Sequence, residues 1–467
     1  MTSYGTREAG QMSYDPIAII GMGCRFPGAP TYGRLWELLG ERGDAVAPSA
    51  PDGRIDTADL YDPTPRRSGR LVSRAGGFVD YAGDFDAALF GISEREAAVV
   101  DPQHQVLLTT THDALRDAGL AAESLAGQDI GVFMGQSTGE HWDALRANVT
   151  VDMYAIAGAA ARSMASGRIS HAWDLRGPCA TVDAACSSGT LAVHLACQSL
   201  RTGECDTAVA GGVSLVLGTD HTVGYSAAGM LSATGRCSFA DENADGFIRS
   251  DGAGVVILKR LDQARSDGDT IHAVILGSAQ ASKGRTAKAI IAPSIPGYLQ
   301  VIDRACANAG IAPERLGYVE AHGNAAPAGD TLELQAIGTA IGRHREPGQP
   351  CLVGSVKTNI GHPEAAGGLA GLIKAALIVR HRSIPASLHC DRPTSGVDWT
   401  GLNIAGVPDR LDWPYPGAAV AGVSTYGLSG IFVHIVIGEP PGITERSTEH
   451  QPKQRTNDQG RRDRQRS

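Results

Sequence analysis

The chain has 467 residues, of which 42% are hydrophobic and 19% are charged, and its formal net charge is -9 at pH 7. This length and apolar content suffice for one large layered unit or for two or more domains, so a globular protein is expected. The acidic balance argues against a nucleic-acid-binding surface, which needs clustered Lys and Arg, and no apolar run approaches the length of a membrane span.

The first residues, 1–14, are polar and lack the apolar segment of a signal peptide, so we expect a flexible N-terminus. The chain has nine cysteines and no CxxC pair. An odd number without such a pair fits neither a disulfide framework nor a zinc site. We therefore expect no bound metal and a reducing, cytoplasmic location.

Strand-like and helical patterns alternate from residue 15 onward. The strand-like runs are IAIIGM, IGVFMG, TAVAGGVSLVL, GAGVVILKR, AVILGSA, YVEAHG, LVGSVK and IFVHIVIGE. Helical patterns include REAAVVDPQHQVLLTTTHDALRDAGL and GLAGLIKAALIVRH. Several of the strands are apolar on both faces, as in a sheet that helices cover on both sides. The pattern predicts a layered α/β fold.

One cysteine stands at a predicted strand-to-helix junction, in the stretch DAACSSGTLAVHLA. Residues 180–182 favour a strand, and apolar residues from Leu191 to Leu200 recur with helical spacing, with an end near Gly203. The small neighbours of Cys186 allow a strained turn with an exposed side chain. Amides at the helix N-terminus would lower the thiol pKa toward neutrality. A buried cysteine is also a common small core residue, so the turn alone leaves both interpretations open.

A polar, glycine-containing segment, Asp262 to Asp269, predicts a seam between two halves. The N-terminal half, 15–263, contains the cysteine turn, and the C-terminal half, 264–439, contains two histidine loops. From Pro440 the sequence is rich in charge and nearly devoid of apolar residues. We expect a disordered tail over 440–467.

The two histidine loops resemble each other in their surroundings. His322 follows the strand-like YVE in EAHGNAAPAGD, and His362 lies at a similar junction in GSVKTNIGHPEAAGGLAG. Catalytic groups are commonly placed on loops at the ends of a sheet. A lone histidine there is more often structural, but two of them with a thiol on a turn fit acyl-thioester chemistry.

Several segments resemble, in order, the β-ketoacyl synthase (ketosynthase) domains of modular type I polyketide synthases. They are DPIAIIGMGCRFPGA, DAACSSGTLAVHLACQSLRTGECDTAVAGGVSLVL, ADGFIRSDGAGVVILKRL, EAHGNAAPAGDTLEL, GSVKTNIGHPEAAGGLAGLIKAAL and GVSTYGLSGIFVHIVI. The resemblance runs from about Asp15 to Glu439. It implies a thiolase fold, in which two similar halves form a five-layered αβαβα core, and usually a homodimer.

The resemblance also implies roles for particular residues. Cys186 would attack a carrier-bound acyl thioester, and His322 and His362 would stabilise the oxygen that becomes anionic when a carbon nucleophile forms. The amides of Cys186 and Leu428 would form the oxyanion hole. Lys357 and Glu364 resemble the family's supporting residues, although a buried salt-bridge network without a chemical role is an equal alternative.

The implied partner is an acyl carrier protein or a peptidyl carrier protein, whose phosphopantetheine arm is the handle of the substrate. The resemblance implies no cofactor of the protein's own, and no nucleic acid or membrane as a partner. Asn324, Ala326, Leu428 and Phe432 are the residues expected along the channel for the arm and the substrate.

The sequence departs from the family pattern in this channel. The family's HGTGT loop reads HGNAA, so Asn324 and Ala326 replace two threonines, and GTNAH reads GIFVH, which introduces Phe432. The family's DPQQR reads DPQHQ. A lost hydroxyl hydrogen bond costs about 0.5–1.5 kcal/mol, which weakens the hold on a pantetheine arm without abolishing it.

Three hypotheses for the function follow. The chain contains no acyltransferase, ketoreductase or carrier region, so it is expected to act in trans in polyketide or hybrid peptide–polyketide (antibiotic) biosynthesis. It could cyclise and release a chain held on Cys186, or it could elongate that chain by decarboxylative Claisen condensation with a malonyl-type extender. The altered arm-binding loop favours the cyclase. The third hypothesis, a non-catalytic partner subunit, is the weakest because the cysteine and both histidines are present.

Overall fold

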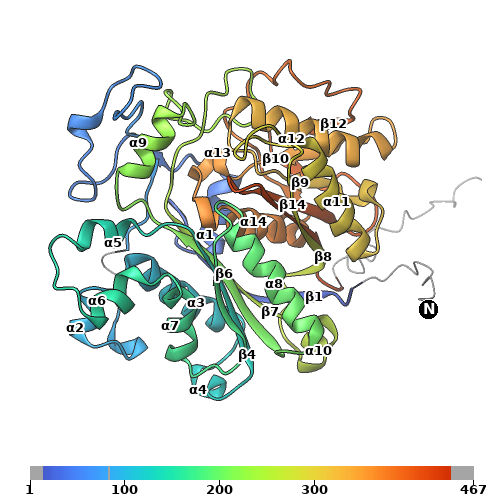
Figure 1. Cartoon of the computed structure of the whole chain (residues 1–467). Coiled ribbons are helices and arrows are strands. Elements are labelled where there is room, and N and C mark those ends of the chain that lie inside the picture. Colours follow the sequence, from blue (N-terminus) through green and yellow to red (C-terminus); the bar gives the residue numbers. More distant parts are fainter. Residues whose placement is uncertain (1–13, 82–84, 443–467) are drawn as a thin grey trace, which may run out of the picture.

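The computed structural model describes residues 14–81 and 85–442. Residues 1–13 of the expected flexible N-terminus and most of the expected tail lie outside these residues. Eleven strands form one continuous sheet in the order β12-β10-β9-β14-β15-β8-β1-β7-β6-β4-β5 (Figure 1). The strands of its first half are β1 (Ile17–Arg25), β4 (Ile130–Gln136), β5 (Cys179–Val182), β6 (Thr207–Ser214) and β7 (Gly252–Arg260). The others are β8 (Ala273–Ser282), β9 (Tyr318–Glu320), β10 (Cys351–Gly354), β12 (Ile404–Gly406), β14 (Val420–Tyr426) and β15 (Ile431–Gly438).

The two halves of the sheet repeat one pairing pattern. In the first half, β1 pairs antiparallel with β7, β7 antiparallel with β6, β6 parallel with β4, and β4 parallel with β5. In the second half, β8, β15, β14, β9 and β10 follow with the same succession of directions. A short antiparallel pairing between β1 and β8 joins the halves. The two similar halves that the resemblance implies are therefore present.

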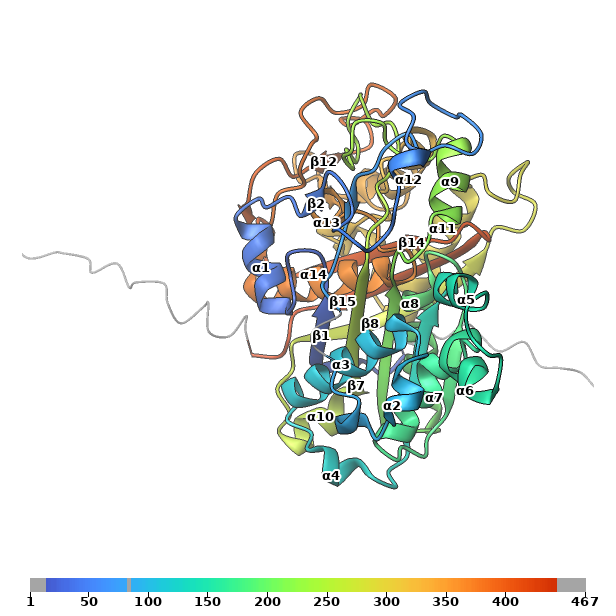
Figure 2. The same cartoon turned by 90° about the vertical axis from the view of Figure 1, so that its left-hand side faces the viewer.

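The core has five layers of helices and strands (Figures 1 and 2). The helices α8 (Ser188–Thr202) and α14 (Gly367–His381) contribute to a central apolar cluster between the two halves of the sheet. The helices α3 (Pro102–Asp117) and α7 (Met164–Ala172) cover the outer face of the first half, and α11 (Ile295–Ala309) and α12 (Pro327–Ala340) cover that of the second. Along β1, Ile17 and Ile19 face the central cluster, whereas Ala18 and Ile20 face the outer one. This alternation explains why the strands are apolar on both faces.

The central helices approach each other through glycine. A Cβ on Gly189 of α8 would overlap the side chain of Leu369 of α14 and would lie 2.7 Å from the Ala365 carbonyl oxygen. The first thirteen residues of α14 are all buried. Small residues are therefore required where α8 begins, which is also where the cysteine turn ends.

The remaining α-helices and β-strands are short. They are α1 (Tyr32–Gly40), β2 (Val46–Ala47), β3 (Gly76–Gly77), α2 (Glu94–Ala97), α4 (Ala122–Leu125), α5 (Glu140–Leu145), α6 (Met153–Ala155), α9 (Asp220–Ala227), α10 (Leu261–Asp267), α13 (Lys357–Ile360), β11 (Ser383–Ile384) and β13 (Leu411–Asp412). Across residues 14–81 and 85–442, no helix combines the length and the apolar content that crossing a membrane requires.

One predicted helical segment is divided in the structure. The single helical pattern over 95–120 forms α2 and α3, because Pro102 has no N–H to continue a helix and the Asp101 carboxylate caps the new one by accepting from the Gln103 amide at 2.8 Å. The polar segment Asp262 to Asp269 is mostly helix α10, which connects β7 of the first half to β8 of the second.

Candidate active site

Cys186 lies between the end of β5 and the start of α8, as the sequence predicts. The preceding residue, Ala185, has a φ of +52°, so the turn is held in the left-handed region that only glycine adopts without strain. The Ser188 hydroxyl stabilises this turn, because it accepts from the Ala184 amide at 2.9 Å and donates to the Ala185 carbonyl at 2.6 Å. The local sequence thus holds the thiol on a rigid elbow.

The C-terminal half packs directly against this elbow. The turn between β14 and β15 passes so close that a Cβ on Gly427 would overlap the Ala184 carbonyl oxygen. The Ser187 hydroxyl also donates to the Ile431 carbonyl at 3.1 Å. Leu428, which follows Gly427 in the turn between β14 and β15, lines the same cavity as Cys186. The two amides expected to form the oxyanion hole therefore belong to segments in direct contact.

His322 follows β9 and is buried. Its Nδ1 accepts a hydrogen bond from the Tyr426 amide at 3.3 Å, so the proton of a neutral ring is on Nε2. Burial, together with the nearby charge of Lys357, lowers its pKa well below the ordinary value. The Glu333 carboxylate fixes the backbone by accepting from the amides of His322 and Gly323, at 2.7 and 3.0 Å. The ring is thus a neutral, oriented N–H donor.

His362 follows α13 and lies next to His322. The ring centroids are 5.4 Å apart and the planes nearly perpendicular. Neither ring nitrogen of His362 has a hydrogen-bond partner within residues 14–81 and 85–442. Burial lowers its pKa well below the ordinary value, and the charge of Lys357 lowers it further. His362 is therefore a neutral imidazole with a free nitrogen that can take up a proton.

The thiol of Cys186 differs from the sequence-based expectation. Burial raises its pKa to about 12, the Glu364 carboxylate adds to the increase, and the Lys357 ammonium opposes it. The desolvation of a thiolate in this cavity outweighs the helix N-terminus that was expected to lower the pKa. The thiol is consequently protonated before the reaction, and attack requires a neighbouring base.

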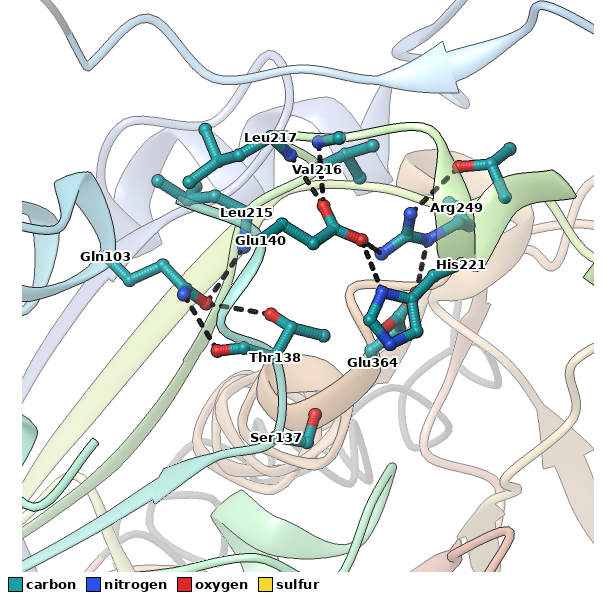
Figure 3. Close-up of polar contacts among 12 residues, drawn as sticks. Gln103, Ser137, Thr138, Glu140, Leu215, Val216, Leu217, His221, Arg249 and Glu364 are labelled. Atoms are coloured by element: carbon teal, nitrogen blue, oxygen red, sulfur yellow. Dashed lines mark hydrogen bonds and ion pairs between the residues drawn. The ribbon is translucent and has the colours of Figure 1, made fainter. Parts of the chain in front are cut away.

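Lys357 and Glu364 do not pair with each other. The Lys357 ammonium donates to the His322 carbonyl at 2.6 Å and is buried. Glu364 lies in the 3₁₀ turn Glu364–Ala366, lines the cavity, and accepts from Arg249 Nε at 2.5 Å. Figure 3 shows that Arg249 also reaches Glu140, which is beside His221. The two supporting residues of the sequence analysis thus belong to two separate polar networks.

One cavity of about 190 Å³ brings most of the predicted residues together, but Lys357 does not line it. It is lined by Cys186, His322, His362, Asn324, Ala326, Glu364 and Leu428, and also by Tyr225, Met230, Phe247, Ile291, Pro293, Tyr298, Ala328, Gly329, Asp330, Glu333 and Tyr426. Within the described part of the chain, no group of three His, Cys, Asp or Glu side chains could hold a metal ion.

Phe432 does not line this cavity, so its placement in the channel was wrong. It lies on the outer face of β15, is fully buried, and packs against Tyr298 and Tyr426 with ring centroids 4.7 and 4.9 Å away. These two tyrosines form part of the wall, and Phe432 supports them from behind. Sequence reasoning missed the aromatic wall, because Tyr225, Phe247, Tyr298 and Tyr426 come from distant segments. It also missed Arg249, although FIRSDGAG was among the segments that carried the resemblance.

Two family models match the chain in succession. The model described as "Beta-ketoacyl synthase, N-terminal domain" matches residues 14–264, and the model described as "Beta-ketoacyl synthase, C-terminal domain" matches residues 272–391. Together they include the cysteine turn, both histidine loops and the strands of the sheet up to β10, whereas β12, β14 and β15 lie beyond residue 391.

Curated relatives are much longer than this chain. The pikromycin polyketide synthase component PikAII of Streptomyces venezuelae is 41% identical over 437 residues, which cover 92% of this chain and 12% of the relative. The mycocerosic acid synthase-like polyketide synthase of Mycolicibacterium smegmatis is 44% identical over 437 residues, which cover 91% of this chain and 20% of the relative. The chain thus spans about an eighth to a fifth of these two proteins.

Solved structures of ketosynthases match the fold. The ketosynthase from module 6 of the bacillaene synthase of Bacillus subtilis has a TM-score of 0.83 and 34% identity, over 91% of this chain and 72% of that one. The oxazolomycin ketosynthase domain of Streptomyces albus has a TM-score of 0.84 and 33% identity, over 91% of this chain and 75% of that one. The five layers of this chain are thus shared with solved ketosynthase domains.

Proposed function

The chain belongs to the β-ketoacyl synthase family, and we propose that it forms a carbon–carbon bond on an acyl chain held as a thioester of Cys186. The observation that carries this proposal is that Cys186, His322 and His362 line one cavity as a protonated thiol and two neutral imidazoles. A protonated nucleophile next to a neutral base is the arrangement that nucleophilic catalysis needs.

We assign each group a part in the reaction. His362 takes the thiol proton, and Cys186 attacks the acyl thioester while the amides of Cys186 and Leu428 stabilise the oxyanion. The proton then passes to the departing thiol of the carrier. In the second step, a carbon of the chain loses a proton to His362 and attacks the Cys186 thioester, and the released thiolate takes that proton back. Nε2–H of His322 donates to the enolate oxygen, a role that its tautomer supports. The stabilisation of such an oxygen is worth several kcal/mol in a dry site.

We infer that the carbon nucleophile belongs to the same acyl chain, so that ring closure releases the chain from Cys186. The side-chain oxygen of Asn324 already accepts from the Ala326 amide at 3.2 Å, and Ala326 has no hydroxyl. The loop therefore offers one free amide group to a second pantetheine arm. An intramolecular nucleophile needs no second arm, and its effective molarity can reach about 10⁵ M or more.

The experiment supplies an acyl-loaded carrier with and without a malonyl-loaded carrier and determines the masses of the products. Cyclisation gives a product equal to the acyl chain minus the carrier thiol, and it needs no malonyl thioester. Strict dependence on malonyl thioester, with carbon dioxide released in step with product, would replace this inference by elongation. A protein that forms no product of either kind, with every substrate loaded, would support the non-catalytic partner subunit.

We propose that an acyl or peptidyl carrier protein delivers the chain next to an arginine-rich loop. Residues 64–74 contain Arg66, Arg67, Arg70 and Arg74. Arg66 is exposed, forms no ion pair with a described residue, and lies 2.5 Å from the Cβ that a side chain on Gly229 would have. Gly229 precedes Met230, which lines the cavity. A phosphate or an acidic helix of a carrier would complement this positive charge close to the cavity.

Charge reversal tests this docking site. Arg66→Glu is expected to raise KM for the carrier-bound substrate by about tenfold, as loss of a favourable charge contact of about 1.4 kcal/mol would, and to leave a carrier-free thioester analogue unaffected. Arg265→Glu on the exposed surface of α10 is the matched control. An equal effect of the two variants would exclude a specific role of the loop.

We also propose a homodimer, which two exposed features support. Strand β5 is at one end of the sheet and leaves an unpaired edge, which native proteins rarely expose. Val151, Met153, Tyr154 and Ile156 are 58%, 71%, 43% and 39% exposed, so large apolar side chains gather in one short segment. A second copy of the chain could cover both.

A further inference from the structure

A row of charged side chains leads from the catalytic cavity to the surface. Glu364, which lines the cavity, accepts from Arg249 Nε at 2.5 Å, and Arg249 Nη2 donates to Glu140 at 2.9 Å. Glu140 accepts from His221 Nδ1 at 2.8 Å (Figure 3). The side chains of Arg249, Glu140 and Glu364 are only 3–5% exposed, whereas that of His221 is 44% exposed. His221 is thus the one member of this row that solvent reaches easily.

His221 is on α9, the helix that forms one wall of the cavity. Tyr225, four residues later on the same face of the helix, lines the cavity. Its ring lies edge-on to Phe247, with centroids 5.4 Å apart, and Phe247 contacts His362 at 5.2 Å. Thr222 lies between His221 and Tyr225 on α9, and its hydroxyl accepts from Arg249 Nη1 at 2.8 Å. The polar contacts at the start of α9 therefore fix the side chain that faces the substrate.

The charge balance makes the protonation state of His221 matter. Two carboxylates and one guanidinium leave one excess negative charge in a buried cluster, and a protonated His221 neutralises it. The hydrogen bond with Glu140 raises the pKa of His221 above its ordinary value of 6.5, and burial opposes this. The other groups that face the ring are Arg249, which lowers the pKa, and Glu364, which raises it, with the Tyr225 ring 6.4 Å away. The ion pair with Glu140 is present below this raised pKa and is lost as the pH rises through it.

We propose that His221 is a positioning residue, whose protonated ring clamps α9 to Glu140 and so holds Tyr225 against the acyl chain in the cavity. This inference rests on the proposed function for its substrate, but the clamp itself is a property of the free protein. The part of the reaction that it affects is the binding of the acyl group, because His221 is separated from the cavity by Glu140 and Arg249. The loss of the clamp makes acyl binding weaker at alkaline pH.

The kinetic experiment measures KM and kcat for acyl transfer to Cys186 from an acyl carrier between pH 5.5 and pH 9. For the wild type, KM should rise about fivefold across the titration of His221, which corresponds to about 1 kcal/mol for a partly exposed ion pair. His221→Gln should show the higher KM at every pH, and His221→Lys should keep the lower KM to pH 9, because a lysine keeps its charge to about pH 10. His344→Gln, on the exposed turn after α12, is the control.

The variants separate this effect from other titrations in the same pH range. Glu333, which holds the His322 loop, has a pKa that burial raises to about 7, so the wild-type profile alone does not identify His221. A rise in KM that persists in both His221→Gln and His221→Lys would overturn the proposal. So would a larger change in kcat than in KM, because a positioning residue for the acyl group acts on binding.

Hydrogen exchange tests the clamp without any catalysis. In the wild-type protein, the amides of residues 220–227 should exchange faster, relative to the intrinsic rate, above the pKa of His221 than below it. His221→Lys should remove this difference, and an unchanged protection of α9 in His221→Gln would overturn the clamp. If exchange follows this pattern but no acyl group is transferred to Cys186, the clamp stands and the proposed function fails.

Discussion

Replacing Glu140 by glutamine is expected to lower the free energy of unfolding by about 3 kcal/mol at pH 6. Burial alone would raise the pKa of Glu140, but the hydrogen bond from His221, the charge of Arg249 and the Leu217 amide bring it down to about 2, from an ordinary 4.5. Because one pH unit corresponds to about 1.4 kcal/mol, the ionised carboxylate is stabilised by about 3 kcal/mol in the fold. A glutamine keeps the shape and one acceptor, but it leaves Arg249 and His221 without their anion.

The pH dependence of this difference distinguishes charge from packing. A carboxylate with a lowered pKa stabilises the fold fully above its unfolded pKa of about 4.5, and this contribution is lost as the pH falls through about 2. The difference between the wild type and Glu140→Gln should therefore be about half as large at pH 3 as at pH 6. Urea unfolding, followed by circular dichroism, measures it. A difference that is equal at both pH values, or smaller than about 0.5 kcal/mol at pH 6, would refute the reasoning.

Three further outcomes are expected. His322→Ala should abolish formation of the carbon–carbon bond while acylation of Cys186 remains, whereas His362→Ala, which lacks the base for the thiol proton, should lose most of the acylation as well, as product analysis beside intact-mass analysis would show; product at the wild-type rate in both would exclude the assigned roles. Gly427→Ala should slow acyl loading and lower the free energy of unfolding by about 1–3 kcal/mol, because its Cβ overlaps the Ala184 carbonyl oxygen beneath the cysteine turn, whereas Gly406→Ala, with nothing within 4 Å of its Cβ, should change neither. Analytical ultracentrifugation should show a homodimer, and a monomer at micromolar concentration would contradict the proposed use of the β5 edge.

The layers of the fold could be predicted because they depend on local patterns. The strands β1, β4, β6, β7, β8 and β15 read as apolar runs, and α14 has helical spacing with a glycine-rich start. Strand β14, of sequence VAGVSTY, was not among the predicted strands. Its small residues give a weak apolar signal, and Gly422 has no room for a side chain because its Cβ would lie 2.7 Å from the ring of His434.

The candidate site could be predicted only in part. Cys186, His322 and His362 each lie at an element boundary that the sequence marks, and the resemblance connected them. The neighbours of Glu364 could not be found in this way, because Arg249 and Glu140 are separated from it by 115 and 224 residues and only the folded chain brings them together. The prediction of a lowered thiol pKa for Cys186 was wrong for a related reason. The sequence of the turn indicates the helix amides that lower the pKa, but it does not show the burial that raises it.

The central claim is that Cys186 is the acylated nucleophile, and intact-mass analysis of the protein after incubation with an acyl-loaded carrier tests it directly. The wild type and Cys179→Ala, which changes an exposed cysteine of β5, should each gain one acyl mass, which peptide mapping locates at Cys186. Cys186→Ala should gain none. An acyl adduct that persists in Cys186→Ala, or that maps to another cysteine of the wild type, would contradict the account.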